Sequence, residues 1–178
     1  MLHCWVVTDG RAGIENQALG LAEAVGRRVA LEITTKRIRI GEPWRSLPGA
    51  VWGDPLERLS KDGALLRPPY PELLIACGRL AAPVAAAVKQ KHPRTFVVQL
   101  QTPPVAAAAF DLVIPPEHDR RAGANVFPIL GAPHRATRAR IEADAALLAE
   151  TPDIARLPAP RVAVLLGGPN RAYRFGAA

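Results

Sequence analysis

The apolar positions of the chain come in short dense runs that alternate with amphipathic stretches. The dense runs predict buried strands, and stretches with apolar residues every three or four positions predict helices. Continuous apolar strands separated by helices are typical of a parallel sheet covered on both faces, so we predict a Rossmann-like α/β domain. The expected strands are residues 2–8, 29–40, 72–77, 95–99, 110–114, 126–130 and 161–166, and the expected helices are residues 15–26, 78–91 and 137–150.

Two segments interrupt this regular pattern. Residues 41–69 are rich in Pro, Gly and Trp, and we expect only short helical turns there. Residues 151–160 carry three prolines, as a linker does, and the strand expected after them has no helix or sheet of its own. The chain is therefore either truncated or its last segment docks back on the first domain. We predict an N-terminal Rossmann-like domain at 1–150, a linker at 151–160 and the start of a truncated second domain at 161–178.

The charge balance is basic, with 23 Lys and Arg against 16 Asp and Glu and a net charge of +7. The cations are scattered, which fits either a solvated basic face or an anionic partner, such as a phosphorylated small molecule or a membrane surface. No specific nucleic-acid partner is expected. The sequence has neither a signal peptide nor an apolar run long enough to span a membrane. We expect a cytoplasmic protein, either free or peripheral to a membrane.

The two cysteines, Cys4 and Cys77, lie inside apolar runs. This position predicts buried free thiols in a reducing compartment. The chain has no metal-type cysteine spacing, and we expect neither a metal site nor another cofactor.

Polar residues and glycines follow nearly every predicted strand. Ligands of open parallel sheets bind outside the carboxyl ends of the strands, so we expect these residues to line one site. Gly10 and Gly13 do not complete a dinucleotide fingerprint; their loop is either a tight turn or a place where backbone N–H groups meet an anion. The other candidate ligand-binding residues are Asn16, Gln17, Gly78, Arg79, Gln99, Gln101, His134, Gly167, Gly168 and Asn170.

Three residues at these strand ends are candidates for catalytic acids or bases, namely Asp9, Glu117 and His118. The alternative for Glu117 and His118 is a solvated loop. Arg79 is expected to start a helix, where a cation opposes the helix dipole. It therefore either contacts an anion or pairs with Asp9 or Glu117.

The amide side chains have two interpretations as well. Gln99 and Gln101 alternate at a strand end, so we expect them to share one face and to find a partner in a ligand. Asn16 and Gln17 either bind sugar hydroxyls or, in the case of Asn16, cap the first helix. His134 either contacts a phosphate or binds a neighbouring carbonyl.

Five segments together resemble the mitochondrial-fission Elm-type family of plants and bacteria. They are TDGRAGIENQALGLAEAVG, PELLIACGRLAAPVAAAVKQKHPRTFVVQLQTP, FDLVIPPEHD, NVFPILGAPHR and RVAVLLGGPNRAYRF, and they cover almost the whole chain. That family in turn resembles the two-domain glycosyltransferase fold called GT-B. In such enzymes the N-terminal domain usually binds the acceptor, and the C-terminal domain binds the nucleotide-sugar donor.

The resemblance implies a glycosyltransferase-like protein that binds or acts on a nucleotide-diphosphate sugar. Glu117, His118 or Asp9 would then deprotonate the acceptor, and Gly167, Gly168 and Asn170 would begin the donor side. An isolated fragment without the donor half is expected to be inactive.

Two other functions stay open. One is a non-enzymatic interaction module of the same family, which recruits a protein partner at a membrane surface. Its candidate surface is the 41–69 segment with Trp44 and Trp52, although both tryptophans also fit a packing role. The other is an epimerase-like sugar-nucleotide enzyme, for which the expected dinucleotide fingerprint is absent.

Overall fold

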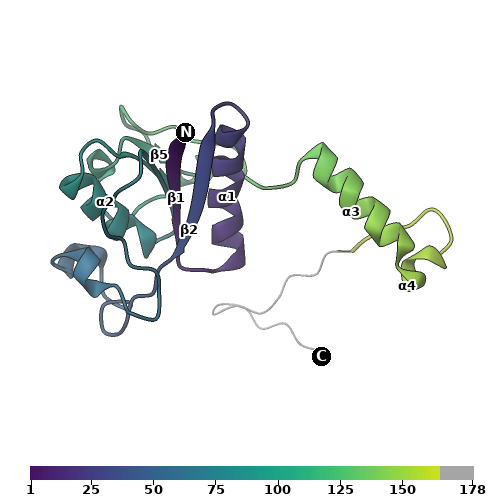
Figure 1. Ribbon diagram of the computed structural model, residues 1–178, viewed down its shortest axis with the longest axis horizontal. Coiled ribbons are helices and arrows are strands. Elements are labelled where there is room, and N and C mark those ends of the chain that lie inside the picture. The colour runs from purple at the N-terminus through teal and green to yellow at the C-terminus, as the bar shows by residue number, and fades with distance from the viewer. Residues whose placement is uncertain (165–178) are drawn as a thin grey trace. The chain divides into compact units, whose positions relative to one another are not determined.

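The structure is a computed structural model that describes residues 1–164 (Figure 1). The chain divides into two compact units, Met1–Ala136 and Thr137–Ala178. The first unit contains every strand of the described residues. Its elements are β1 (Leu2–Thr8), α1 (Ala12–Gly26), β2 (Leu31–Arg37), β3 (Leu73–Cys77), α2 (Ala81–Lys91), β4 (Phe96–Leu100) and β5 (Leu112–Ile114), with short 3-10 helices η1 (Gly49–Val51), η2 (Pro55–Arg58), η3 (Ala107–Ala109) and η4 (Glu117–Asp119).

The five strands of the first unit are all parallel and lie in the order β2-β1-β3-β4-β5. This sheet with its helices confirms the predicted Rossmann-like α/β fold. The chain passes from β1 outward to β2, and then returns to place β3 on the other side of β1. The strand order therefore reverses between β1 and β3, and such a switch point is a preferred ligand position in open α/β sheets.

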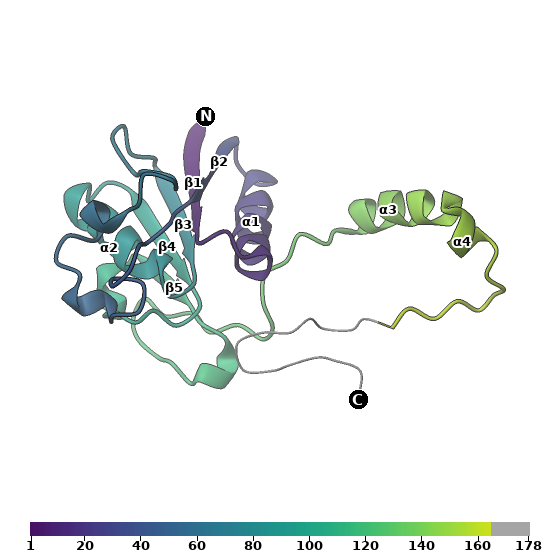
Figure 2. The ribbon, with the colours of Figure 1, turned by 90° about the horizontal axis from the view of Figure 1, so that it is seen from below.

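The two long helices of the first unit cover opposite faces of the sheet (Figure 2). Helix α1 packs through Ala18 and Ala22 on a layer that includes Val6 and Leu100. Helix α2 packs on the other face, in a second layer to which the irregular segment contributes the buried Trp52. The small apolar side chains of both helices let them approach the strands closely, and strands buried on both faces explain the continuous apolar runs in the sequence.

Residues 126–130, predicted as a sixth strand, run along β5 without forming a regular strand. Two isolated parallel bridges join this edge segment to β5 and to the residues that follow β5. Pro115, Pro116 and Pro128 have no backbone N–H, so they interrupt the ladder of hydrogen bonds that a strand requires. The prediction of a sixth strand is therefore wrong, although the segment still runs parallel to β5.

The predicted bounds of several other elements also differ from the structure. Strand β2 is shorter than predicted and ends at Arg37; Ile38 and Ile40, which come after it, are buried in the layer of α2. Helix α2 begins at Ala81, because Gly78 has a φ of +90°, which lies outside the helical region. Helix α1 begins at Ala12, earlier than predicted.

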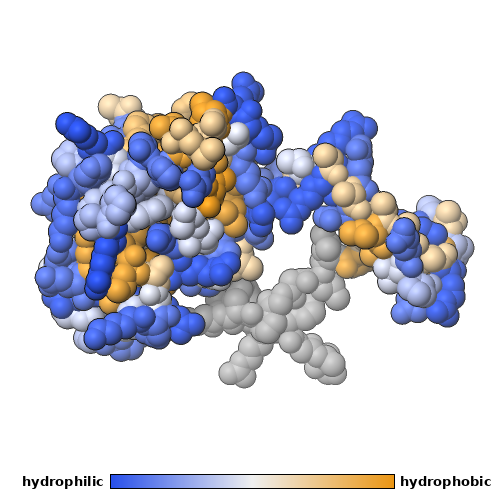
Figure 3. All heavy atoms as spheres, viewed as in Figure 1, coloured by the Kyte–Doolittle hydropathy of each residue, from blue (hydrophilic) through white to orange (hydrophobic). Residues whose placement is uncertain are grey.

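The second unit contains α3 (Arg138–Glu150) and α4 (Pro152–Ala155). The backbone N–H of Arg140 donates to the hydroxyl of Thr137 at 3.3 Å, so Thr137 caps α3. Apolar side chains of α3 are exposed, since Ile141 and Leu148 are 58% and 55% accessible. Figure 3 shows apolar surface on this helix. Residues 161–164 have no regular secondary structure, and the rest of the strand predicted at 161–166 lies outside the described residues.

Candidate functional site

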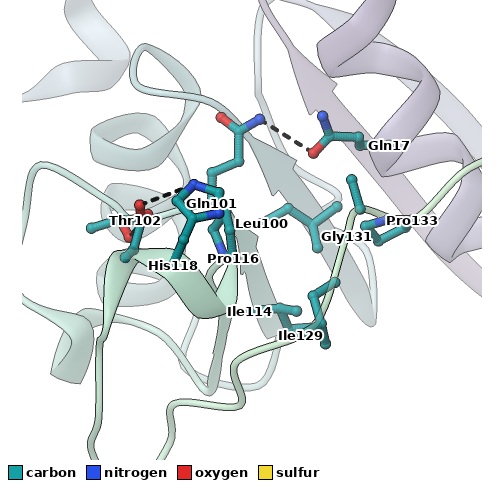
Figure 4. A pocket seen from close by; sticks show the side chains of 12 residues that line it. Gln17, Leu100, Gln101, Thr102, Ile114, Pro116, His118, Ile129, Gly131 and Pro133 are labelled. Carbon is teal, nitrogen blue, oxygen red and sulfur yellow. Dashed lines mark hydrogen bonds and ion pairs between the residues drawn. The ribbon is translucent and has the colours of Figure 1, made fainter.

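A pocket of about 610 Å³ lies at the carboxyl ends of β4 and β5 (Figure 4). Its floor is apolar, and its walls carry amide, hydroxyl, imidazole and carboxylate groups. Such a mixture of apolar contact surface and a few polar groups is typical of small-molecule sites. The lining residues are Gln17, Leu100, Gln101, Thr102, Ile114, Pro116, His118, Asp119, Ile129, Gly131, Ala132 and Pro133.

One wall of the pocket is formed by two amide side chains from different elements. Gln101 follows β4, and its Nε2 donates to Oε1 of Gln17 on α1 at 3.2 Å (Figure 4). Gln101 has a φ of 68°, which is unusual for a residue with a side chain. This backbone conformation turns its side chain toward α1. The contact still leaves Oε1 of Gln101 and Nε2 of Gln17 available to a ligand.

A second wall contains the short helix η4, which carries a histidine beside an aspartate. Nε2 of His118 lies 3.5 Å from Oδ1 of Asp119. The other carboxylate oxygen, Oδ2, accepts a hydrogen bond from the hydroxyl of Thr102 at 2.5 Å. Thr102 thus orients the carboxylate, and the carboxylate can hold the imidazole. His118 was predicted as a candidate base, whereas Asp119 and Thr102 were not chosen as site residues.

The third wall is a strap, residues 131–135, which crosses α1 after the edge segment. A Cβ on Gly20 of α1 would lie 2.6 Å from the carbonyl carbon of His134, so only glycine permits this close approach. The guanidinium of Arg135 binds the carboxylate of Glu23 on α1, with Nη2 2.6 Å from Oε1. His134 itself is exposed and does not line the pocket. Its backbone, rather than its side chain, helps to shape the site.

The loop between β1 and α1, predicted as part of the same site, is occupied by its own ion pairs. Asp9 binds Arg11, with Oδ2 2.7 Å from Nη2. Glu15 receives two hydrogen bonds from Arg37 at 2.7 and 2.8 Å, which lower the pKa of its carboxyl. Gly10 has a φ of +81°, as the tight-turn interpretation requires. These groups do not line the pocket, and neither does Gly13.

Helix α1 starts without a side-chain cap, since the residue before it is Arg11. Asn16 lies inside the helix and is exposed, so the prediction that it caps the first helix is wrong. A Cβ on Gly78 would lie 3.3 Å from Cγ2 of Ile14, so the start of α1 fills the space beside the end of β3. Ile14 therefore lies against the switch point between β1 and β3.

Arg79 does not reach the pocket or an acidic partner. Its Nη2 donates to the carbonyl oxygen of Arg45 at 2.8 Å, which ties the irregular segment to the start of α2. Within residues 1–164, Arg79 makes no ion pair with Asp9 or Glu117, so the prediction of such a pair is wrong. The side chain of Glu117 is exposed and is not part of the pocket lining.

Gln99 and Gln101 lie on different faces of the sheet, which corrects the prediction that they share one. Gln99 comes two residues after Val97 on β4, so it shares the face of Val97 and points into the layer of α2, whereas Gln101 contacts Gln17 on α1. The left-handed backbone of Gln101 breaks the alternation on which the prediction relied. Gln99 is fully buried, and its Nε2 donates to the carbonyl oxygen of Leu100 at 2.5 Å.

The tryptophans of the irregular segment are packing residues. Trp52 is 1% exposed, and its Nε1 donates to the carbonyl oxygen of Leu47 at 3.2 Å. Trp44 is partly buried under the guanidinium of Arg58, 4.2 Å from its ring centroid. The prediction that Trp52 belongs to a partner-binding surface is therefore wrong. Burial does not allow it to contact another molecule in the folded state.

Cys4 and Cys77 are buried free thiols, as predicted. Burial raises the pKa of each to about 12, so neither is a nucleophile at neutral pH. No group of three or more His, Cys, Asp or Glu within residues 1–164 is arranged to hold a metal ion. No helix in this part of the chain is long and apolar enough to cross a membrane.

The predicted site residues are thus divided. The pocket brings together Gln17, Gln101 and His118 from three distant parts of the sequence. Gly167, Gly168 and Asn170 lie outside the described residues. The candidates that stay away from the pocket are Asp9, Gly10, Gly13, Asn16, Gly78, Arg79, Gln99, Glu117 and His134.

Residues 12–178 match a family model described as Mitochondrial fission ELM1. The matched range includes every residue that lines the pocket. No curated protein matches the chain, and no solved structure matches it.

Proposed function

The chain belongs to the Mitochondrial fission ELM1 family, and from that premise we propose that its first unit is the acceptor-binding domain of a glycosyltransferase-like protein. The acceptor would be an uncharged, hydroxyl-rich group, and the donor a nucleotide-diphosphate sugar. The observation that carries the proposal is the pair of amides, Gln17 and Gln101, which lines the same pocket of about 610 Å³ as the His118–Asp119 pair.

The polar groups of the pocket suit a sugar better than an ion. A carboxamide both donates and accepts hydrogen bonds, as a hydroxyl does, and it carries no charge. The apolar floor, with Leu100, Ile114 and Ile129, offers a surface for the C–H face of a sugar ring. The lining contains no arginine or lysine, so nothing within it would balance a phosphate.

The His118–Asp119 pair supplies the base that glycosyl transfer requires. Nε2 of His118 faces Asp119, so Nδ1, the other ring nitrogen, would take the proton from the acceptor hydroxyl while the hydroxyl oxygen attacks the anomeric carbon of the donor. The bond from that carbon to the nucleoside diphosphate would break, and the diphosphate would leave with the electron pair. Asp119, held by Thr102, would stabilise the imidazolium that forms.

Saturation-transfer NMR tests acceptor binding directly, with a panel of free hexoses and methyl glycosides added to the full chain. We expect signals from at least one sugar, and we expect Gln17→Ala to remove them. Asn16→Ala is the matched control, because Asn16 is the preceding residue of α1 and is exposed. If no sugar in a broad panel gives a signal, the proposal is wrong.

The role of His118 is tested separately, in a transfer assay with UDP- and GDP-sugars on a protein that also carries the donor-binding half. His118→Ala should keep sugar binding and lower the transfer rate by about 10²–10⁴-fold, the usual contribution of a general base. Glu117→Ala is the matched control, since Glu117 is adjacent and outside the pocket lining. Equal losses in the two variants would assign no special role to His118.

A further inference from the structure

Apolar side chains beside the pocket are exposed in the part of the chain that the structure describes. Leu130 is 91% exposed and Phe127 is 64% exposed, both on the edge segment beside β5. Phe127 and Ile129 are two residues apart in an extended stretch, so their side chains share a face. Ile129 lines the pocket, and Phe127 therefore lies beside it.

Two arginines follow the other wall of the same pocket. The backbone N–H of Glu117 donates to the carbonyl oxygen of Ile129 at 2.9 Å, which joins η4 to the edge segment. Arg120 ends η4 with a φ of 50°, and its N–H donates to the carbonyl oxygen of Glu117 at 3.0 Å. The side chains of Arg120 and Arg121 are exposed and make no ion pair within residues 1–164.

From this juxtaposition we propose that the rim formed by Arg120, Arg121, Phe127 and Leu130 docks on an anionic lipid surface. Exposed apolar side chains next to unpaired cations are the combination that holds a protein at a membrane interface. The net charge of +7 favours the same partner. The inference rests on the proposed function and narrows its acceptor class: the acceptor would be a sugar headgroup carried by a membrane lipid.

The opposite end of the sheet provides a comparison of similar composition. Arg27, Arg28 and Val29 follow α1, and Val29 is 44% exposed. This second cluster is also basic and apolar, but it lies at the amino ends of the strands and borders neither wall of the pocket. If composition alone caused membrane binding, the two clusters would contribute equally.

Co-sedimentation of the full chain with vesicles tests the proposal. We expect binding to vesicles of mixed phosphatidylglycerol and phosphatidylcholine, and much weaker binding to phosphatidylcholine alone. Arg120→Gln with Arg121→Gln should weaken binding about thirtyfold, since two cations leave the interface. Phe127→Ser with Leu130→Ser should weaken it by about tenfold or more. Arg27→Gln with Arg28→Gln should leave it nearly unchanged.

Two results would overturn the proposal: no binding to the mixed vesicles, or equal losses for the two arginine pairs. If the rim instead binds another protein, the chain should not bind the mixed vesicles, and that result would overturn the proposal. The rim variants change exposed side chains, and unchanged thermal melting would verify that they fold. Saturation transfer from soluble sugars separates the two proposals, because the rim variants should keep it. If sugar binding is absent while vesicle binding depends on the rim, the acceptor pocket is wrong and the membrane surface stands.

Discussion

At the switch point between β1 and β3, the polar side chains bind one another, whereas at the ends of β4 and β5 they face a pocket. Asp9 is paired with Arg11, and Glu15 is paired with Arg37. The amides of Gln17 and Gln101 share one hydrogen bond and keep two groups available. Both regions have the residue types of a ligand site, and both lie at carboxyl ends of parallel strands. They differ in whether those groups already have partners.

The difference shows that the strand order of the sheet limits where a binding site can lie but does not determine its position. The strand order alone favours the point between β1 and β3. At that point Ile14 lies against Gly78, and the polar side chains of the loop are paired with one another. The pocket instead forms where the edge segment and the strap enclose the ends of the last two strands. We call the ends of β1 and β3 the closed end, because the polar groups there are paired with one another, and the ends of β4 and β5 the open end, because the polar groups there line a pocket. The predictions below test this contrast.

The largest effect is expected from Gly20→Ala in α1. The new Cβ would lie 2.6 Å from the backbone of His134, so the strap must move away from the helix. We expect a loss of about 1–3 kcal/mol in the free energy of unfolding, the usual cost of overpacking, together with loss of sugar binding. Chemical denaturation measures the free energy of unfolding. Amide exchange at residues 131–135 should become faster, because the strap no longer packs on α1.

Gly13→Ala is the matched control, because it is the same substitution in the same helix. A Cβ at Gly13 meets nothing within 4 Å. This variant should be more stable by about 0.5–1 kcal/mol, since alanine is the better helix former. If both variants behave alike, the strap does not depend on close contact with α1.

Gln101→Gly is expected to separate binding from stability. Glycine removes the cost of a left-handed backbone but adds flexibility to the unfolded chain, so stability should stay within about 1 kcal/mol of the parent. Removing the amide should abolish sugar binding. Arg120→Gly relieves a similar backbone conformation, with a φ of 50°, and should keep the binding of soluble sugars. Retained sugar binding in Gln101→Gly would remove Gln101 from the site.

The smallest effect is expected at the closed end, from Glu15→Gln. The hydrogen bonds from Arg37 lower the pKa of Glu15 in the folded state. The carboxylate therefore adds stability above its unfolded pKa of about 4.3, and this contribution disappears as the pH falls through the lower folded value. The variant should be slightly less stable at neutral pH and equal to the parent in strong acid. Thermal melting across pH measures this, with Glu42→Gln as the unpaired control, and sugar binding at neutral pH should persist.

The strands and helices follow from local patterns and were therefore predictable. The dense apolar runs at β1, β3 and β4 give the buried centre of the sheet, and Gln17, Gln101 and His118 were among the predicted site residues. These predictions needed only periodicity and the rule that polar residues gather at carboxyl ends of strands.

The rest depended on contacts between distant residues, which a single sequence does not reveal. The left-handed turn at Gln101 reversed the face predicted from alternation. Gly20 carries no local sign that a strap more than one hundred residues later lies against it. The residue types of the loop between β1 and α1 alone suit an anion site. In the structure, however, Asp9 and Glu15 bind Arg11 and Arg37, so these charged groups already have partners. The wrong prediction of a strand at the edge segment was avoidable from the sequence, because prolines lack the backbone N–H that a strand needs.

Chemical-shift mapping of the ¹⁵N-labelled full chain, titrated with a sugar that gives saturation transfer, tests the central claim most directly. The account predicts shifts in the side-chain amides of Gln17 and Gln101 and in the backbone of His118 and Gly131. It predicts no change at residues 9–13, between β1 and α1. Shifts confined to residues 9–13, with the amides of Gln17 and Gln101 unmoved, would contradict it.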